Sequence, residues 1–238
     1  MARRNVSRED WLAARKVLLA KEKQATRLRD ELTAERLSLP MVRTEKDYVF
    51  QGTSGSRSLA DLFNGQPQFL VYHFMFEPEW SEGCKSCSHF LDNSAGALVH
   101  LQARNTAFAV VSLAPIEKID AFRRRMGWDV TWVSSAGSDF NRDFEVSIDI
   151  ADESSAYNYT SAKALLAAGK IWFPKGELPG LSTFLRDGDD IYYTYSLYQR
   201  GFDIFLNTYN FLDVTPLGRH EEDAPGQSWI RHHDRYPA

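Results

Sequence analysis

The sequence predicts an α/β protein in which helices flank a central mixed sheet, with a helical extension at the N-terminus, an insertion before the last hairpin and an irregular C-terminal tail. Two runs, 68–76 and 107–114, are almost continuously apolar and aromatic, as strands covered on both faces are. Each run is followed by apolar residues at helical spacing, at 88–103 and 116–126. This alternation predicts parallel strands joined by crossover helices.

Residues 8–37 form the predicted N-terminal helix. The segment is rich in Ala, Leu, Arg, Lys and Glu, and Ser7 begins a capping-box-like pattern. Lys21 and Glu22 interrupt the apolar stripe, so the helix has only one narrow apolar seam. The seam consists of Trp11, Ala14, Leu18, Ala25, Leu28 and Leu32. Pro40 prevents any continuation of the helix.

The remaining elements give weaker signals. Three short ones are expected: a strand at 48–51, a helical turn at 59–63 and a third parallel strand at 130–133. Regular spacing weakens between 139 and 180, which is predicted to be an insertion. Asp187 and Gly188 mark a hairpin turn, and 201–209 is expected to form a last helix. The predicted domains are an extension at 1–40, a body at 41–215 containing the insertion, and a tail at 216–238.

Composition excludes several classes of function. No stretch approaches the roughly 20 uninterrupted apolar residues of a membrane span, and the start MARRNVSREDW lacks the apolar region of a secretory signal. A cytoplasmic location without membrane attachment is therefore expected. The 28 Lys and Arg against 32 Asp and Glu give a net charge of −4, which offers no general reason to bind nucleic acid.

The charge is unevenly distributed along the chain. Residues 1–37 carry a local charge of +4, because ten basic side chains face six acidic ones, and the remaining residues carry −8. A basic helix with a narrow apolar seam is expected to lie across the acidic surface of a partner subunit. The sequence therefore predicts a homodimer.

The two cysteines, Cys84 and Cys87, form a Cys-x-x-Cys motif between the strand at 68–76 and the helix that follows it. This is the context of a redox dithiol. Free N–H groups and the positive end of the helix dipole favour a thiolate on the first cysteine, and Lys85 adds positive charge. Cys84 is therefore the predicted nucleophile, and Cys87, one turn inward, would resolve the mixed disulfide.

The order of strand, Cys-x-x-Cys helix, strand, helix, hairpin and final helix resembles the thioredoxin fold from about residue 48 to 209. Beyond the fold, the chain resembles one bacterial family of thioredoxin-like proteins, the domain-of-unknown-function 899 family, whose members are described as predicted dithiol-disulfide oxidoreductases. The motifs that carry this resemblance are YHFMF, GCKSCS, EKIDAFRRRMGW, WVSSAGSDFNRDF, PGLSTFLRDGD, YTYSLYQRG, LDVTPLGR and WIRHHDRY. The resemblance implies an oxidoreductase that acts on a disulfide-containing small molecule or protein partner, and no cofactor is expected.

Two departures from ordinary thioredoxins concern the substrate groove. Gly83 stands directly before the first cysteine, where thioredoxin has Trp, although Trp80 could still cover the site. Thioredoxins also place a cis-proline before the strand that faces the dithiol. Counting back from the hairpin turn puts this slot near Ser182 or Leu181, and Pro179 lies slightly too early to fill it. Without a proline in the slot, small disulfides or a dedicated partner are better candidate substrates than extended protein chains. The predicted substrate-binding residues are Trp80, Ser81, Lys85, Ser182 and Thr183.

Other interpretations of the motif stay open. Ser81 lies three residues before Cys84, where peroxiredoxins place a Thr or Ser, so the alternative enzyme is a thiol peroxidase in which Cys87 resolves a sulfenic acid. His89 extends the pair to Cys-x-x-Cys-x-His, which could supply three metal ligands, so a non-enzymatic metal-binding or interaction module is a third possibility. The His-His-Asp segment at 232–234 could bind metal or assist proton transfer, although packing is its favoured interpretation.

Overall fold

The computed structural model describes residues 4–221 and 226–237, and the chain divides into two compact units, Met1–Pro40 and Met41–Ala238. Residues 1–3, 222–225 and 238, which belong to the predicted extension and tail, lie outside the described residues. The remaining boundaries predicted for the insertion and the tail stay predictions.

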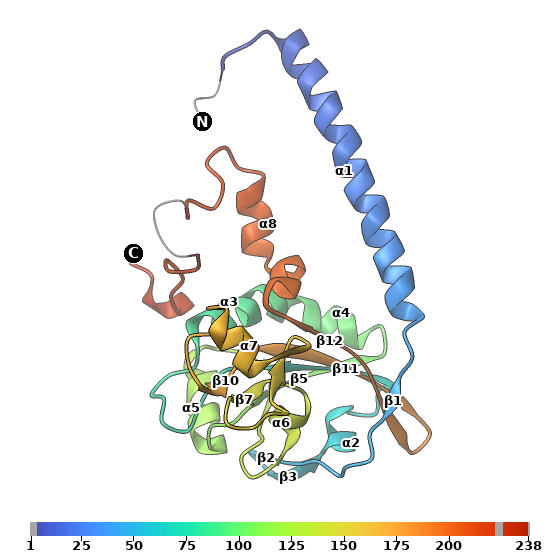
Figure 1. Cartoon of the computed structure of the whole chain (residues 1–238), viewed down its shortest axis with the longest axis vertical. Helices are drawn as coiled ribbons and strands as arrows, with labels where there is room; N and C mark the ends of the chain where they lie inside the picture. Colours follow the sequence, from blue (N-terminus) through green and yellow to red (C-terminus); the bar gives the residue numbers. More distant parts are fainter. Residues whose placement is uncertain (1–3, 222–225, 238) are drawn as a thin grey trace. The chain divides into compact units, whose positions relative to one another are not determined.

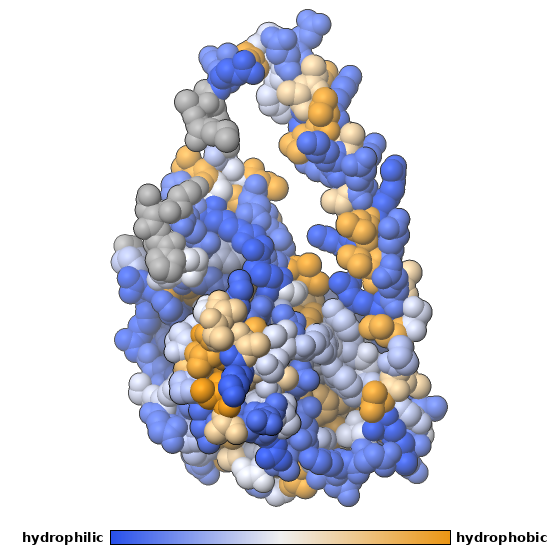
Figure 2. All heavy atoms as spheres, viewed as in Figure 1, coloured by the Kyte–Doolittle hydropathy of each residue, from blue (hydrophilic) through white to orange (hydrophobic). Residues whose placement is uncertain are grey.

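The first unit contains the helix α1 (Arg8–Leu37), and Figure 1 shows it as one uninterrupted helix. The Ser7 side chain accepts a hydrogen bond from the N–H of Asp10 at 3.1 Å, which caps the helix start as predicted. None of the side chains of α1, all of which are described, is buried. Figure 2 shows apolar patches at intervals along α1, with hydrophilic residues between them.

The second unit is built on an eight-stranded sheet within the described residues, in the order β1-β12-β11-β4-β5-β6-β2-β3 (Figure 1). Its strands are β1 (Val42–Arg43), β2 (Val49–Gly52), β3 (Gly55–Ser58), β4 (Gln68–His73), β5 (Thr106–Ser112), β6 (Thr131–Ser134), β11 (Gly180–Asp187) and β12 (Asp190–Tyr198). Strands β4, β5 and β6 are parallel, whereas β11 is antiparallel to β4 and to β12. Gly188 forms the predicted hairpin turn with φ +60°.

Short helices connect and cover the strands. They are α2 (Leu59–Leu62), α3 (Lys85–Ser94), η1 (Ala95–Ala97), α4 (Leu98–Gln102), α5 (Ile116–Arg125), η2 (Gln199–Phe205), α8 (Asn207–Asp213) and η3 (His233–Arg235). The sequence β4, α3, β5, α5, β11, β12 and α8 follows the order of the thioredoxin fold, so the predicted thioredoxin-like α/β fold is confirmed. In the described part of the chain, no helix has the length and apolar character needed to cross a membrane.

Two predicted helices have different boundaries in the structure. The helix expected at 88–103 is divided into α3, η1 and α4, because the 3₁₀ turn at Ala95–Ala97 contains Gly96, which disfavours a continuous α-helix. The helix expected at 201–209 is instead the 3₁₀ segment η2 followed by α8. A positive φ of 48° at Gln199, the first residue of η2, accompanies the change of direction after β12.

The stretch between β6 and β11 contains two small two-stranded sheets rather than a strand of the main sheet. Its elements are α6 (Phe140–Asp143), β7 (Ser147–Asp149), β8 (Ala156–Tyr157), β9 (Thr160–Ser161), α7 (Ala162–Ala167) and β10 (Lys175–Glu177). Strand β7 pairs with β10 and β8 pairs with β9. The buried ring of Tyr157 belongs to a separate hydrophobic cluster formed by these elements.

The main core places α3 directly against the central strand. Tyr72 of β4 and Phe90 of α3 stack with ring centroids 4.0 Å apart, in a cluster that also contains Cys87. Val71, the neighbour of Tyr72 in β4, belongs to a different cluster because successive strand residues point to opposite faces. The Cys-x-x-Cys segment is thus positioned on a rigid strand and helix.

Candidate active site

Cys84 occupies the N-cap position of α3. After β4 the chain turns back, and the N–H of Cys84 donates to the carbonyl of Met75 at 3.0 Å. The carbonyl of Cys84 accepts the N–H and the hydroxyl of Ser88, each at 2.9 Å, so the first turn is fixed around this residue. The backbone N–H groups of Ser86 and Cys87 hydrogen-bond to the Cys84 sulfur. The predicted location at a helix start is therefore observed.

The close packing around Gly83 explains why no large residue precedes the first cysteine. A Cβ atom at this position would lie 2.6 Å from the ring of Phe74 and 2.8 Å from that of Phe122. The Gly83 carbonyl also accepts a hydrogen bond from Nε2 of His232 at 2.8 Å. The tryptophan that thioredoxin has here would not fit, because both the ring wall and the C-terminal tail occupy the space.

The two thiols have different environments. Cys84 is half-buried, whereas Cys87 is only 2% exposed. The hydrogen bond from the Cys87 thiol, followed by the backbone N–H groups and the charge of Lys85, lowers the pKa of Cys84 despite its burial. Burial and the neighbouring Cys84 sulfur raise the pKa of Cys87 well above its ordinary value. The pair therefore combines a half-buried thiol that ionises more readily with a buried thiol that ionises less readily.

Tyr72 places a phenol against the buried thiol. Its side chain hydrogen-bonds to the Cys87 sulfur, and the backbone of Met75 makes a second hydrogen bond to the same atom. Tyr72 is 2% exposed, and burial raises its pKa well above the ordinary value, so the phenol stays protonated and can donate. These two hydrogen bonds favour the thiolate form of Cys87, against the effect of burial.

Both cysteines line a pocket of about 310 Å³. The remaining lining residues are Tyr72, Met75, Ser86, Phe90, Pro179, Gln199, Arg200, Phe202, Asp203, Leu206 and Gln227. Four of these, Tyr72, Phe90, Phe202 and Leu206, are buried, as is Cys87, so the buried part of the lining is mainly apolar. Of the two cysteines, Cys84 is the more exposed residue.

The structure does not bring Ser182 and Thr183 to this pocket. The hydroxyl of Ser182 is fully buried and hydrogen-bonds to Nε2 of His73 at 3.0 Å and to Ser196 at 2.8 Å. The hydroxyl of Thr183 hydrogen-bonds to that of Thr194 at 2.7 Å. Both residues therefore belong to the pairing of β11 with its neighbouring strands.

Pro179 occupies the slot that sequence counting placed near Ser182 or Leu181. It stands directly before β11 and lines the cysteine pocket. The count was wrong because β11 extends eight residues back from the turn and starts at Gly180. The described residues contain no cis peptide bond, Pro179 included. The Tyr157 hydroxyl donates to the Pro179 carbonyl at 2.9 Å, so β8 supports this wall.

The other predicted substrate-binding residues lie around the pocket rather than in it. The Trp80 carbonyl accepts a hydrogen bond from Nζ of Lys118 at 3.0 Å, and its side chain packs against the main core. Ser81 is exposed in the same loop. Nζ of Lys85 is 3.4 Å from the carbonyl of Ser228, in the C-terminal tail. None of these three residues lines the pocket.

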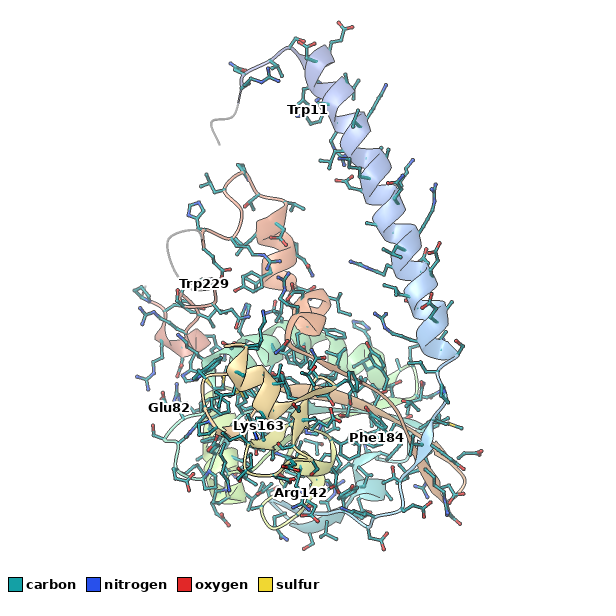
Figure 3. All side chains as sticks on the ribbon, viewed as in Figure 1. Trp11, Glu82, Arg142, Lys163, Phe184 and Trp229 are labelled. Carbon is teal, nitrogen blue, oxygen red and sulfur yellow. The ribbon has the colours of Figure 1, made fainter. Side chains whose placement is uncertain are left out.

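The C-terminal tail packs onto the start of α3, which sequence reasoning did not foresee in detail. Oε1 of Glu221 accepts hydrogen bonds from the hydroxyl of Tyr209 at 2.7 Å, the N–H of Gln227 at 3.0 Å and Nε1 of Trp229 at 2.7 Å. Figure 3 shows Trp229 between the end of the chain and α8. Gln227 thereby becomes a pocket residue although 140 residues separate it from the cysteines in the sequence. No motif could have revealed this contact.

His89 does not join the cysteines as a metal ligand. Its ring is 7% exposed, neither of its nitrogens has a hydrogen-bond partner, and it packs edge-on against Tyr209 and Trp229. Burial lowers its pKa, which favours the neutral ring. Across residues 4–221 and 226–237, no group of three or more His, Cys, Asp or Glu side chains is arranged to hold a metal ion. His232, His233 and Asp234 contact Gly83, Asp92 and Arg125, respectively.

Comparison with known proteins gives one family. The family model described as a bacterial protein of unknown function (DUF899) matches residues 1–236. No curated protein matches the chain. Similar solved structures include a peroxiredoxin Q mutant from Xanthomonas campestris, at 12% identity and a TM-score of 0.45, covering 73% of this chain and 98% of that one.

Two further structures show similar values. Peroxidoxin BcpB from Mycobacterium tuberculosis has 13% identity and a TM-score of 0.43, over 71% of this chain and 94% of that one. A putative protein disulfide isomerase from Bacteroides thetaiotaomicron has 14% identity and a TM-score of 0.38, over 73% of this chain and 92% of that one.

Proposed function

The chain belongs to the DUF899 family of bacterial proteins of unknown function, and we propose that it is a dithiol-disulfide oxidoreductase that uses Cys84 and Cys87. The observation that carries this proposal is the asymmetry of the pair. A half-buried sulfur with a lowered pKa faces a pocket, and a buried sulfur with a raised pKa lies one helical turn behind it. An attacking thiol and a resolving thiol need these two environments.

The first step is nucleophilic attack by the Cys84 thiolate on a substrate disulfide. A bond forms between the Cys84 sulfur and one substrate sulfur, the substrate S–S bond breaks, and the other substrate sulfur leaves as a thiolate that takes a proton from water. The N–H groups of Ser86 and Cys87 keep Cys84 in its reactive form before attack.

The second step releases the substrate. Cys87 loses its proton and attacks the Cys84 sulfur, the mixed disulfide breaks, and the second substrate sulfur leaves and is protonated. The products are a Cys84–Cys87 disulfide and two substrate thiols. The two cysteine sulfurs supply two electrons, and the two protons pass through water, which takes one when Cys84 ionises and one when Cys87 ionises. Once Cys84 is in the mixed disulfide its negative charge is gone, and the hydrogen bonds from Tyr72 and Met75 help Cys87 to ionise. A thiol reductant would restore the dithiol.

A thiol peroxidase remains the alternative, but no contact of the predicted peroxide-positioning residue favours it. Ser81 is exposed and is not among the residues that line the pocket. Consumption of hydrogen peroxide by the reduced protein at a rate above its reaction with disulfides would favour the peroxidase.

The proposal includes a cytoplasmic location and a homodimer. A dithiol that reduces disulfides depends on the thiol reductants of a reducing compartment, which the cytoplasm supplies. The homodimer is supported by α1, a 30-residue helix that buries none of its side chains. It exposes the large apolar side chains of Trp11, Leu18, Leu28 and Leu32, which a second subunit could cover. A helix without buried side chains lacks the tertiary packing from which most helical stability comes, and a partner subunit would supply it.

A redox titration tests the proposed function. The full chain is equilibrated in glutathione buffers of graded potential, free thiols are trapped with an alkylating mass tag, and the tagged fraction is counted. We expect both thiols to disappear together in one two-electron transition, and neither Cys84→Ser nor Cys87→Ser to show it. Thiols that stay reduced throughout, or that oxidise only between chains, would contradict the proposal and leave a binding module as the explanation.

A further inference from the structure

We propose that the pocket beside Cys84 binds the apolar substituent of a small, uncharged disulfide, which is then the substrate class of this protein. The inference rests on the proposed function and adds the identity of what enters the site. It is carried by three features of the pocket, namely its lining, the pairing of the charges at its rim, and its size.

The buried side chains that line the pocket are mainly apolar. Phe90, Phe202 and Leu206 are 3%, 7% and 4% exposed, and the rings of Phe90 and Phe202 contact the Tyr72 ring. Nothing in this part of the lining can solvate a charge, because the Tyr72 hydroxyl is already engaged with Cys87. A charged group would lose its hydration here without compensation, whereas an alkyl or aryl group would be stabilised by leaving water.

The rim carries charges that neutralise each other. Arg200 and Asp203 are the two charged residues that line the pocket, and Nε of Arg200 donates to Asp203 at 2.7 Å. The other polar rim residues, Gln199 and Gln227, are uncharged amides. Lys85 is not among the lining residues, since its amine lies near the Ser228 carbonyl. Apart from the ionised Cys84, which every substrate meets alike, the pocket lining therefore presents no unpaired charge that would select an anionic or cationic disulfide.

The size of the pocket favours a compact group. A volume of about 310 Å³ is at the lower end of the range for small-molecule sites, roughly 300–1,000 Å³. One wall is the C-terminal tail, which the bonds of Glu221 to Gln227 and Trp229 hold in place. A few carbon atoms on the substrate sulfur fill such a space, whereas a folded protein loop would have to displace the tail.

A matched set of disulfides tests the substrate class. Di-n-propyl disulfide, bis(2-hydroxyethyl) disulfide, cystamine and 3,3′-dithiodipropionate share an aliphatic C–C–S–S–C–C skeleton and differ in their ends, and glutathione disulfide represents peptides. Each reacts with the reduced full-length protein, the loss of thiols is followed by trapping, and each rate is divided by the rate with dithiothreitol to cancel intrinsic reactivity. We expect the normalised rate for di-n-propyl disulfide to exceed those of the three charged probes by about tenfold or more, as for burial of two methylene-sized groups. Equal normalised rates, or a preference for a charged probe, would overturn the inference.

Substitutions in the pocket provide the second arm. Met75→Lys places an amine at the partly buried pocket wall and should shift the ratio of 3,3′-dithiodipropionate to di-n-propyl disulfide by about tenfold or more toward the anion. Met75→Leu keeps the volume and should retain the preference. Val99→Lys, at a 64% exposed position of α4 outside the pocket, is the matched charge control. Gln227→Lys, at the partly exposed tail, replaces Met75→Lys if that variant does not fold.

The outcomes separate the inference from the proposed function. The first outcome concerns the ratio of the 3,3′-dithiodipropionate rate to the di-n-propyl disulfide rate. If this ratio is the same in Met75→Lys, or in Gln227→Lys in its place, as in Val99→Lys, the pocket does not bind the substituent. The inference is then wrong, while the oxidoreductase proposal stands. If all normalised rates are no higher than those of the Cys84→Ser protein, the proposed function is wrong and the substrate class falls with it.

Discussion

Replacing Tyr72 with Phe should slow the release of substrate from the mixed disulfide while leaving its formation intact. The change removes one hydroxyl, which hydrogen-bonds to the Cys87 sulfur, and keeps the ring that stacks on Phe90 at 4.0 Å. Attack by Cys84 depends on its own hydrogen bonds with Cys87 and Ser86, which the substitution does not touch. Tyr72 therefore acts as a positioning residue for the resolving step.

The size of the effect follows from the lost hydrogen bond. A hydrogen bond to a charged group contributes about 1.5–3 kcal/mol, so the Cys87 thiolate loses about that much stabilisation. A more basic thiolate is also a better nucleophile, with a Brønsted coefficient of about 0.4–0.5. The faster attack by each Cys87 thiolate therefore offsets roughly half of the effect of having fewer thiolates. The remaining loss of about 0.8–1.8 kcal/mol corresponds to a mixed disulfide that lives about 4- to 20-fold longer.

Rapid mixing with an acid quench measures this lifetime. The reduced protein reacts with excess disulfide, samples are quenched at intervals, and mass spectrometry counts the mixed disulfide. Tyr48→Phe is the matched control. Tyr48 belongs to the other hydrophobic cluster and does not line the pocket, and its hydroxyl donates a hydrogen bond to Asp143. A lifetime equal to that of Tyr48→Phe and wild type would refute the role given to Tyr72.

Three further predictions concern charge and assembly. Lys85→Gln removes a cause of the lowered pKa of Cys84, so iodoacetamide should modify this thiol about two- to threefold more slowly near pH 7, and an unchanged rate would remove Lys85 from the account. Burial raises the pKa of Glu177 to about 6 from 4.5, so the folded state holds this proton more tightly and the free energy of unfolding should fall by about 2 kcal/mol as pH rises through that interval. Chemical unfolding of Glu177→Gln should lack this decrease, and a pH dependence equal to that of wild type would contradict it. Leu18→Ser combined with Leu28→Ser should halve the mass measured by light scattering, whereas a monomeric wild type would exclude the homodimer.

The fold could be predicted because its signals are local. The buried strands at 68–76 and 107–114, the helix spacing after each, and the Asp187–Gly188 turn specify the order of elements without any knowledge of distant contacts. The helix expected at 88–103 was too long because spacing alone does not measure the cost of Gly96 within it.

The sequence predicted the part of the site that comes from one local segment, but not the residues that other segments contribute. Cys84 and Cys87 lie at a helix start, and the helix itself produces their asymmetry. Pro179 was missed because its slot depends on the length of β11, and one miscounted strand end moves a residue out of the pocket. Tyr72 and Gln227 reach the pocket through tertiary packing, which leaves no mark in sequence spacing.

Trapping of the mixed disulfide tests the central claim most directly. The Cys87→Ser protein, incubated with a disulfide substrate near neutral pH, should accumulate a substrate adduct on Cys84 that mass spectrometry locates, because the attacking thiol remains and the resolving thiol is gone. The Cys84→Ser protein should trap none, since Cys87 is buried and its pKa is raised. An adduct on Cys87 of the Cys84→Ser protein, with none on Cys84 of the Cys87→Ser protein, would contradict the assigned roles.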